Sequence, residues 1–214
     1  GGSIETPGNA VLPVDLFGNI LRESGDDQLT VVVEGAEIKV TGGSSNYSLP
    51  SQNADEFPDV QHVEGDSRIE IAAGLFGEIV KRTVFATDNE SSRYALGGIL
   101  LETDGGNLIA VGTDGRRLAK MQGPVDIQGD IQLGQSSTIV PTRSMNLIAR
   151  ALGAPDSIVQ IIPSDNQLAF KTEAVTLTSR LVEGRFPKWK DVFPARTESS
   201  KIVLAAGTFY GRLR

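Results

Sequence analysis

The feature of this sequence that most constrains its fold is an internal repeat with a period of about 130 residues. One segment opens on Val11-Leu12-Pro13 and closes on Phe57-Pro58, and a second opens on Ile139-Val140-Pro141 and closes on Phe186-Pro187. The opening prolines are 128 positions apart and the closing prolines 129. A period of this length is that of a domain and not of a solenoid repeat, so we predict a duplicated domain.

A second likeness extends the repeat to both ends of the chain. Residues 67–77 resemble residues 200–211 at an offset of 133. We therefore predict the second half of one unit at 1–66, a complete unit at 67–194 and the start of a third at 195–214. The alternative is coincidence between similar strand and helix patterns, which three markers at near-equal offsets disfavour. Since the chain does not begin with Met, we expect it to be a fragment of a longer protein.

Each unit has the pattern of an α+β domain. Apolar residues recur at helical spacing in four stretches, and β-branched or apolar runs flank short polar turns between them. Each unit thus holds two helices and several antiparallel strands, so we predict that the domain itself consists of two similar halves. The predicted helices are 14–24, 74–84, 142–152 and 207–214, and the predicted strand pairs are 29–33 with 37–40, 94–102 with 108–120, and 157–161 with 167–170.

The sequence lacks residues that several functional classes require. The sequence has no Cys and a single His, His62, which excludes thiolate chemistry and a metal site built from several His ligands. Asp114-Gly115 next to two arginines has two interpretations: an acid beside basic groups, or a turn in which Gly115 supplies a positive φ. We expect no catalytic residues, no cofactor and no metal.

No apolar run is long enough for a membrane span, and no signal peptide is present. We therefore expect a cytoplasmic protein.

Three motifs in order and at the right spacing resemble one family. They are RYALGG at 93–98, TDGRRLA at 113–119 and LVEGRFP at 181–187. Together they resemble the central domain of bacterial DNA sliding clamps, the beta subunit of DNA polymerase III. The resemblance implies a DNA-clamp fold, in which three such domains form a protomer and two protomers close head to tail around duplex DNA. It also implies a non-catalytic processivity factor for DNA replication.

The resemblance implies a hydrophobic pocket that binds short linear motifs of the polymerase and of clamp-loader subunits. Asp191 departs from the family pattern, since a basic residue can occupy that place. The alternative is that the apolar residues among those that match the pocket simply fill the domain core, which applies to Leu118 above all. The residues that match the pocket are Leu96, Thr113, Gly115, Arg116, Arg117, Leu118, Pro187 and Val192.

The net charge of −7 argues against DNA binding by itself. A ring holds DNA topologically, however, so only its inner wall needs positive charge. In this family the helices line that wall, and the four predicted helices carry seven basic residues against three acidic ones. The alternative is that surface helices carry solvated Lys and Arg in any case. The residues predicted to face DNA are Arg22, Lys81, Arg82, Arg93, Tyr94, Arg143 and Arg150.

Two other functions remain open at this point: a non-replicative β-rich scaffold or binding module with a duplicated fold, and a carboxylate hydrolase. We further predict that the homodimeric ring belongs to the intact protein and that this chain alone does not close it. Unmatched strand edges in 1–66 and 195–214 are expected to pack poorly or to pair with neighbouring copies.

Overall fold

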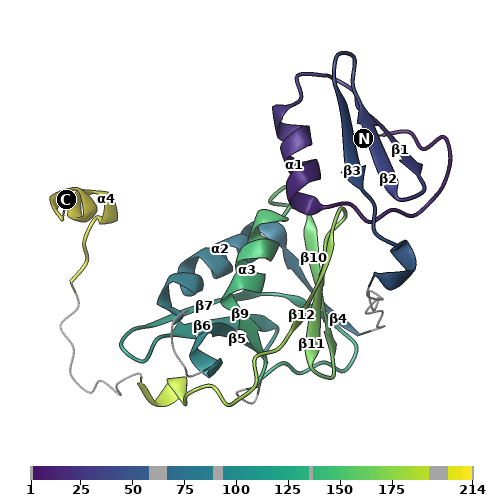
Figure 1. Ribbon diagram of the computed structural model, residues 1–214. Coiled ribbons are helices and arrows are strands. Elements are labelled where there is room, and N and C mark those ends of the chain that lie inside the picture. The colour runs from purple at the N-terminus through teal and green to yellow at the C-terminus, as the bar shows by residue number, and fades with distance from the viewer. Residues whose placement is uncertain (1, 58–66, 89–93, 135–136, 193–201, 214) are drawn as a thin grey trace. The chain divides into compact units, whose positions relative to one another are not determined.

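The computed structural model describes residues 2–57, 67–88, 94–134, 137–192 and 202–213 (Figure 1). The chain divides into two compact units, Gly1–His62 and Val63–Arg214. Within the described ranges, no helix is both long and apolar enough to cross a membrane.

The first unit is a helix followed by a three-stranded antiparallel sheet in the order β1-β2-β3. Its small core consists of Ile20 from the helix, Ile38 and Val40 from the central strand β2, and Leu49 from β3. All of the residues of β1 are exposed. The elements are α1 (Val14–Glu23), β1 (Thr30–Glu34), β2 (Glu37–Thr41), β3 (Asn46–Pro50) and the 3-10 helix η1 (Ala54–Glu56).

The second unit contains two antiparallel sheets and two long helices. The five-stranded sheet has the order β12-β11-β10-β4-β8, and the four-stranded sheet has the order β7-β6-β5-β9. The elements are β4 (Arg68–Ala72), α2 (Ala73–Thr83), η2 (Val84–Ala86), η3 (Tyr94–Leu96), β5 (Gly98–Asp104), β6 (Asn107–Thr113), β7 (Leu118–Pro124), β8 (Asp126–Gln128), β9 (Ile139–Pro141), α3 (Thr142–Arg150), β10 (Ile158–Ser164), β11 (Gln167–Lys171), β12 (Thr176–Arg180), η4 (Trp189–Val192) and the separate helix α4 (Ala206–Arg212).

The second unit is itself duplicated, as predicted. Each half begins with a strand that leads directly into a helix, β4 into α2 and β9 into α3, and continues into a strand meander. Each leading strand pairs with the meander of the other half: Ala72 lies opposite Ile158, and Pro141 lies opposite Gly98. Neither half can complete a sheet by itself, so the two halves fold as one domain.

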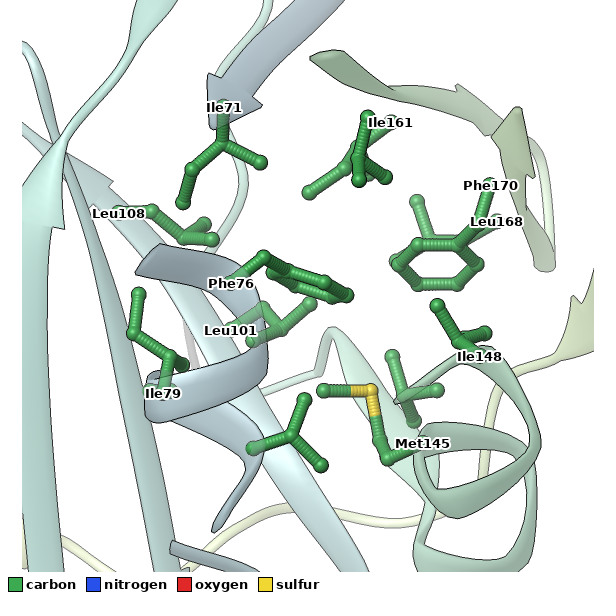
Figure 2. Close-up of a cluster of buried hydrophobic side chains, with 14 of the residues drawn as sticks. Ile71, Phe76, Ile79, Leu101, Leu108, Met145, Ile148, Ile161, Leu168 and Phe170 are labelled. Carbon is green, nitrogen blue, oxygen red and sulfur yellow. The ribbon is translucent and has the colours of Figure 1, made fainter. Parts of the chain in front are cut away.

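The core of this unit lies where both helices meet both sheets (Figure 2). Phe76 of α2 is fully buried, and its ring lies 5.9 Å from the ring of Phe170 on β11. Met145 and Ile148 of α3 complete the cluster from the other helix. Burying an aromatic side chain of this kind stabilises a domain by a few kcal/mol, about 3 or more relative to alanine. The α+β prediction is confirmed, and the antiparallel strands of this unit form two sheets.

Two strand predictions need correction. The strand predicted at 108–120 is two strands, β6 and β7, separated by a turn at 114–117 in which Gly115 has a φ of +84°. The strand predicted from Tyr94 begins only at Gly98, because residues 94–96 form a 3-10 turn. The backbone N–H of Asp88 donates to the carbonyl of Leu96 at 2.9 Å.

Candidate functional site

The turn between β6 and β7 is fixed by hydrogen bonds from its own side chains. Thr113 and Leu118 form the last register pair of the two strands. The buried hydroxyl of Thr113 donates to the carbonyl of Arg117 at 2.7 Å and accepts from the N–H of Gly115 at 3.1 Å. These bonds satisfy backbone groups that the sheet ladder leaves open, so the turn has a defined shape.

Asp114 completes this turn, and the predicted site omitted it. Its carboxylate accepts from the N–H groups of Arg116 and Arg117, both at 2.9 Å, and from Nε of Arg117 at 3.0 Å. The two backbone N–H groups, that of Arg117 first, lower the pKa of the Asp114 carboxyl, and the Arg117 charge adds to this. The turn interpretation of Asp114-Gly115 is therefore the right one. The Asp-Gly pair was the signal that could have found it.

Arg117 is also held by an aromatic side chain. Its guanidinium carbon lies 5.9 Å from the centre of the Phe85 ring, at the edge of the range for a cation–π contact. Phe85 belongs to η2, just after α2, and is 58% exposed. An exposed phenylalanine after a helix has no sequence signature, and the contact brings together residues far apart in the chain. Sequence reasoning therefore missed Phe85.

The apolar residues predicted to converge are placed differently from one another. Leu118 is partly buried and packs against the cluster that contains Phe186 and Trp189. Leu96, at the end of η3, is buried, whereas Pro187 is exposed and Val192 is 64% exposed. The structure thus places Leu118 against a cluster that includes Phe186, the chain neighbour of Pro187. No contact joins all four among the described interactions, so their convergence stays a prediction.

A shallow depression of about 500 Å³ lies close to this region. It is lined by residues 102–104, 132–134 and 187–191 and thus shares only Pro187 with the predicted pocket. Trp189 is one of its lining residues, and the ammonium groups of Lys120 and Lys190 lie 5.3 and 5.4 Å from the centre of its ring. The ammonium of Lys190 also lies 3.8 Å from Glu102.

The basic residues predicted to face DNA are divided between the two units. Lys81 and Arg82 end α2, and Arg143 and Arg150 lie on the neighbouring α3 (Figure 1). All four are exposed. Arg22 is exposed on α1 in the first unit and donates to Asn19. Arg93 lies outside the described residues, and of Tyr94 only the backbone is described.

One acidic residue moderates the charge of α2. Glu78 accepts from Nε of Arg82 at 2.7 Å and lies 3.8 Å from the ammonium of Lys81. The hydrogen bond from Arg82 comes first among the causes that lower the pKa of Glu78. The four basic residues of α2 and α3 therefore face only one compensating carboxylate on their own helices. In the part of the chain that the structure covers, no group of three His, Asp or Glu side chains could hold a metal ion.

Comparison with known proteins points to one family. The family model for the central domain of the DNA polymerase III beta subunit matches residues 70–188. The beta sliding clamp of Pseudomonas aeruginosa is 33% identical over 189 residues, which are 88% of this chain and 51% of that protein. The beta sliding clamp of Vibrio cholerae is 30% identical over 194 residues, or 90% of this chain and 52% of that protein.

Solved structures agree with the sequence relatives. The DNA polymerase III subunit beta from P. aeruginosa is similar with a TM-score of 0.82 and 30% identity, over 92% of this chain and 54% of that one. The DNA polymerase sliding clamp from Bacillus subtilis has a TM-score of 0.83 at 26% identity, over 91% and 50%. The chain thus spans about half the length of the relatives that it matches.

Proposed function

Because this chain belongs to the family of the DNA polymerase III beta subunit, we propose that it is part of a DNA sliding clamp in the bacterial cytoplasm. In this proposal the protein is a processivity factor without catalytic residues or cofactors, and it tethers the replicative polymerase to duplex DNA. The observation that carries the proposal is the family match over 70–188. This range coincides with a domain of two halves, in which the leading strand of each half pairs with the meander of the other. We retain 1–66, 67–194 and 195–214 as the proposed domain division.

The DNA-facing surface in this proposal is the exposed side of the helices. Lys81, Arg82, Arg143 and Arg150 supply positive charge from two adjacent helices, in a chain whose net charge is −7. A protein that encircles DNA needs only weak, sequence-independent attraction to phosphates. Arg22, Arg93 and Tyr94 belong to the same proposed surface. The intact protein is proposed to close as a head-to-tail homodimer around the duplex.

The peptide-binding site is proposed at the β6–β7 turn and the segment that ends in η4. A short linear peptide must gain its affinity from a few buried anchors, because ordering a flexible segment costs entropy. Leu96, Leu118, Pro187 and Val192 are the proposed apolar contacts, and Thr113, Gly115, Arg116 and Arg117 are the proposed rim. The rim is preorganised by the Asp114 and Thr113 hydrogen bonds, which reduces the cost of binding. Partners of this site would be the polymerase and clamp-loader subunits.

A peptide titration tests this site. We expect a labelled peptide with Leu and Phe anchors to bind the chain weakly, and both Val192→Asp and Pro187→Ala to weaken that binding. For Val192→Asp the loss of affinity should be at least about tenfold, because a charge placed in an apolar contact must be desolvated. Val175→Asp, a change at another exposed valine, is the control that should leave affinity intact. Unchanged affinity in both site variants would show that the site is misplaced. Griselimycin, which is bound to a similar P. aeruginosa clamp, is a second probe.

A further inference from the structure

Phe85 is the exposed middle residue of a 3-10 turn, η2, whose two flanking residues are fixed inside the domain. Thr83 and Thr87 lie on either side of η2, and both are buried. The hydroxyl of Thr83 donates to the carbonyl of Ile79 at 2.7 Å, and the hydroxyl of Thr87 donates to the carbonyl of Val84 at 2.8 Å. Phe85 is therefore exposed on a backbone segment that is held at both ends.

The structure fixes η2 beside the β6–β7 turn. The end of β6 lies directly against the end of α2, since a Cβ added to Gly112 would collide with the carbonyl oxygen of Thr83. Gly112 is followed by Thr113, whose hydroxyl holds the β6–β7 turn. The N–H of Asp88 donates to the carbonyl of Leu96, so the chain after η2 is tied to a second part of the proposed peptide site.

Arg117 links Phe85 to this turn and keeps part of its hydrogen-bonding capacity. Its Nε donates to the Asp114 carboxylate at 3.0 Å, and its guanidinium carbon lies 5.9 Å from the centre of the Phe85 ring. Among the hydrogen bonds and ion pairs of the described residues, neither terminal amino group of Arg117 has an acceptor, and the side chain is 61% exposed. Both amino groups can therefore donate to a ligand.

We propose that Phe85 is a positioning residue of the peptide-binding site. It holds the Arg117 guanidinium so that the two terminal amino groups donate to oxygen acceptors of the bound peptide. This inference rests on the proposed function, because the peptide site at the β6–β7 turn is itself a proposal. Phe85 acts through Arg117 and does not have to touch the peptide.

The physical basis is the side-chain entropy of Arg117. An exposed arginine loses rotational freedom when it binds a partner, and this loss opposes binding. Asp114 fixes the guanidinium at one point only, its Nε. The ring of Phe85 restricts the guanidinium from a second direction before a peptide arrives, so less freedom is lost on binding.

A double-mutant cycle on peptide affinity tests this role. The probe is the labelled peptide with Leu and Phe anchors, measured by fluorescence anisotropy on the full chain. Phe85→Leu should lower affinity about two- to fivefold, the range of an exposed cation–π contact. The same change in an Arg117→Met background should have no further effect. Phe85→Trp should restore the affinity, since a Trp ring binds a cation at least as well as a Phe ring.

Phe57→Leu is the matched control, because Phe57 and Phe85 are both 58% exposed and Phe57 lies in the first unit. It should leave peptide affinity intact. An equal loss from Phe85→Leu in both backgrounds would mean that Phe85 does not act through Arg117 and would overturn the inference. No loss in either background would overturn it as well.

A spectroscopic measurement tests the contact without peptide. The Arg117 Nε–H resonance should shift in Phe85→Leu, because the ring current of Phe85 is removed, and it should not shift in Phe57→Leu. An Arg117 resonance that is unchanged by Phe85→Leu would show that the ring does not hold the guanidinium in solution and would overturn the inference.

Failure of the proposed function gives a different result. If Val192→Asp and Pro187→Ala leave affinity unchanged, the peptide site itself is misplaced, and the inference falls with it. If those two changes weaken binding while Phe85→Leu does not, only the role of Phe85 is wrong.

Discussion

At the scale of single residues, the β6–β7 turn depends on a glycine and a carboxylate that contribute in different ways. Gly115 has a φ of +84°, and no described heavy atom outside this glycine and its two chain neighbours lies within 4 Å of the position where a Cβ would be. Any penalty for a side chain at this position therefore comes from the backbone conformation and not from a clash. Asp114 contributes through hydrogen bonds to two consecutive N–H groups.

Gly115→Ala tests the contribution of the glycine. We expect the free energy of unfolding to fall by about 1 to 2 kcal/mol, because a left-handed φ is costly for a residue with a Cβ. Gly115→Asn should cost less, since asparagine tolerates this conformation better. Urea denaturation of the three proteins measures the difference, and equal stability of the Ala and Asn variants would contradict the backbone explanation.

The Asp114 carboxylate makes the turn sensitive to acid. Its pKa in the folded protein is lowered from the usual 3.8, so its stabilising effect is fully present above that value and is lost as pH falls through the lower folded pKa. We therefore expect peptide affinity to be level near neutral pH and to decline below about pH 4. Asp114→Asn should weaken peptide binding and flatten this decline. A decline of the same shape in the Asn variant would assign it to another group.

At the scale of elements, each helix has a buried face that holds the domain and an exposed face that carries charge. Met145 and Ile148 of α3 are buried, and Arg143 and Arg150 are exposed. Helical periodicity separates the two faces, so a charge can change without disturbing the core. DNA binding can therefore be tested on this helix independently of stability.

Reversing the charge on α3 should weaken DNA binding. We expect Arg143→Glu with Arg150→Glu to lower affinity for duplex DNA and to reduce the slope of log affinity against log salt by about 0.9 for each phosphate that the helix no longer neutralises. The matched control is Lys171→Glu with Arg180→Glu, which makes the same change in net charge on exposed strand residues. Fluorescence anisotropy at several salt concentrations measures both. An equal loss of affinity in the control pair would mean that total charge, and not the helix surface, determines binding.

At the scale of the whole molecule, the family model for one clamp domain matches residues 70–188 of this chain. The resemblance to sliding clamps implies six domains in a closed ring. We therefore expect no topological retention on DNA by this chain.

Retention on circular DNA measures this. The chain should leave a nicked plasmid during gel filtration as readily as it leaves the same plasmid made linear. An intact relative such as the P. aeruginosa beta sliding clamp is the positive control for the assay. If the chain stayed on the circle and came off after linearisation, it would encircle DNA, and the prediction would be wrong.

The sequence alone was sufficient for the repeat, the α+β class, the antiparallel strands and the helices. These follow from local periodicity and from turn residues such as Gly35 and Gly105, both of which have a positive φ in the structure. It was also sufficient for the family, because three motifs occur in order. The division of the strand region 108–120 was missed, because the pattern of apolar residues continues across a turn that Asp114 and Gly115 impose.

Only the tertiary structure decided which strands from the two halves pair and which residues surround the turn. The pairing of β4 with β10 joins segments about 90 residues apart, and the contact of Arg117 with Phe85 joins a turn to the end of a helix. The physical reason is that backbone hydrogen bonding in a sheet is nearly independent of side-chain identity, so a strand pattern does not specify its partner. Burial of Phe76 against Phe170 selects the partner, and that burial exists only once both halves have folded together.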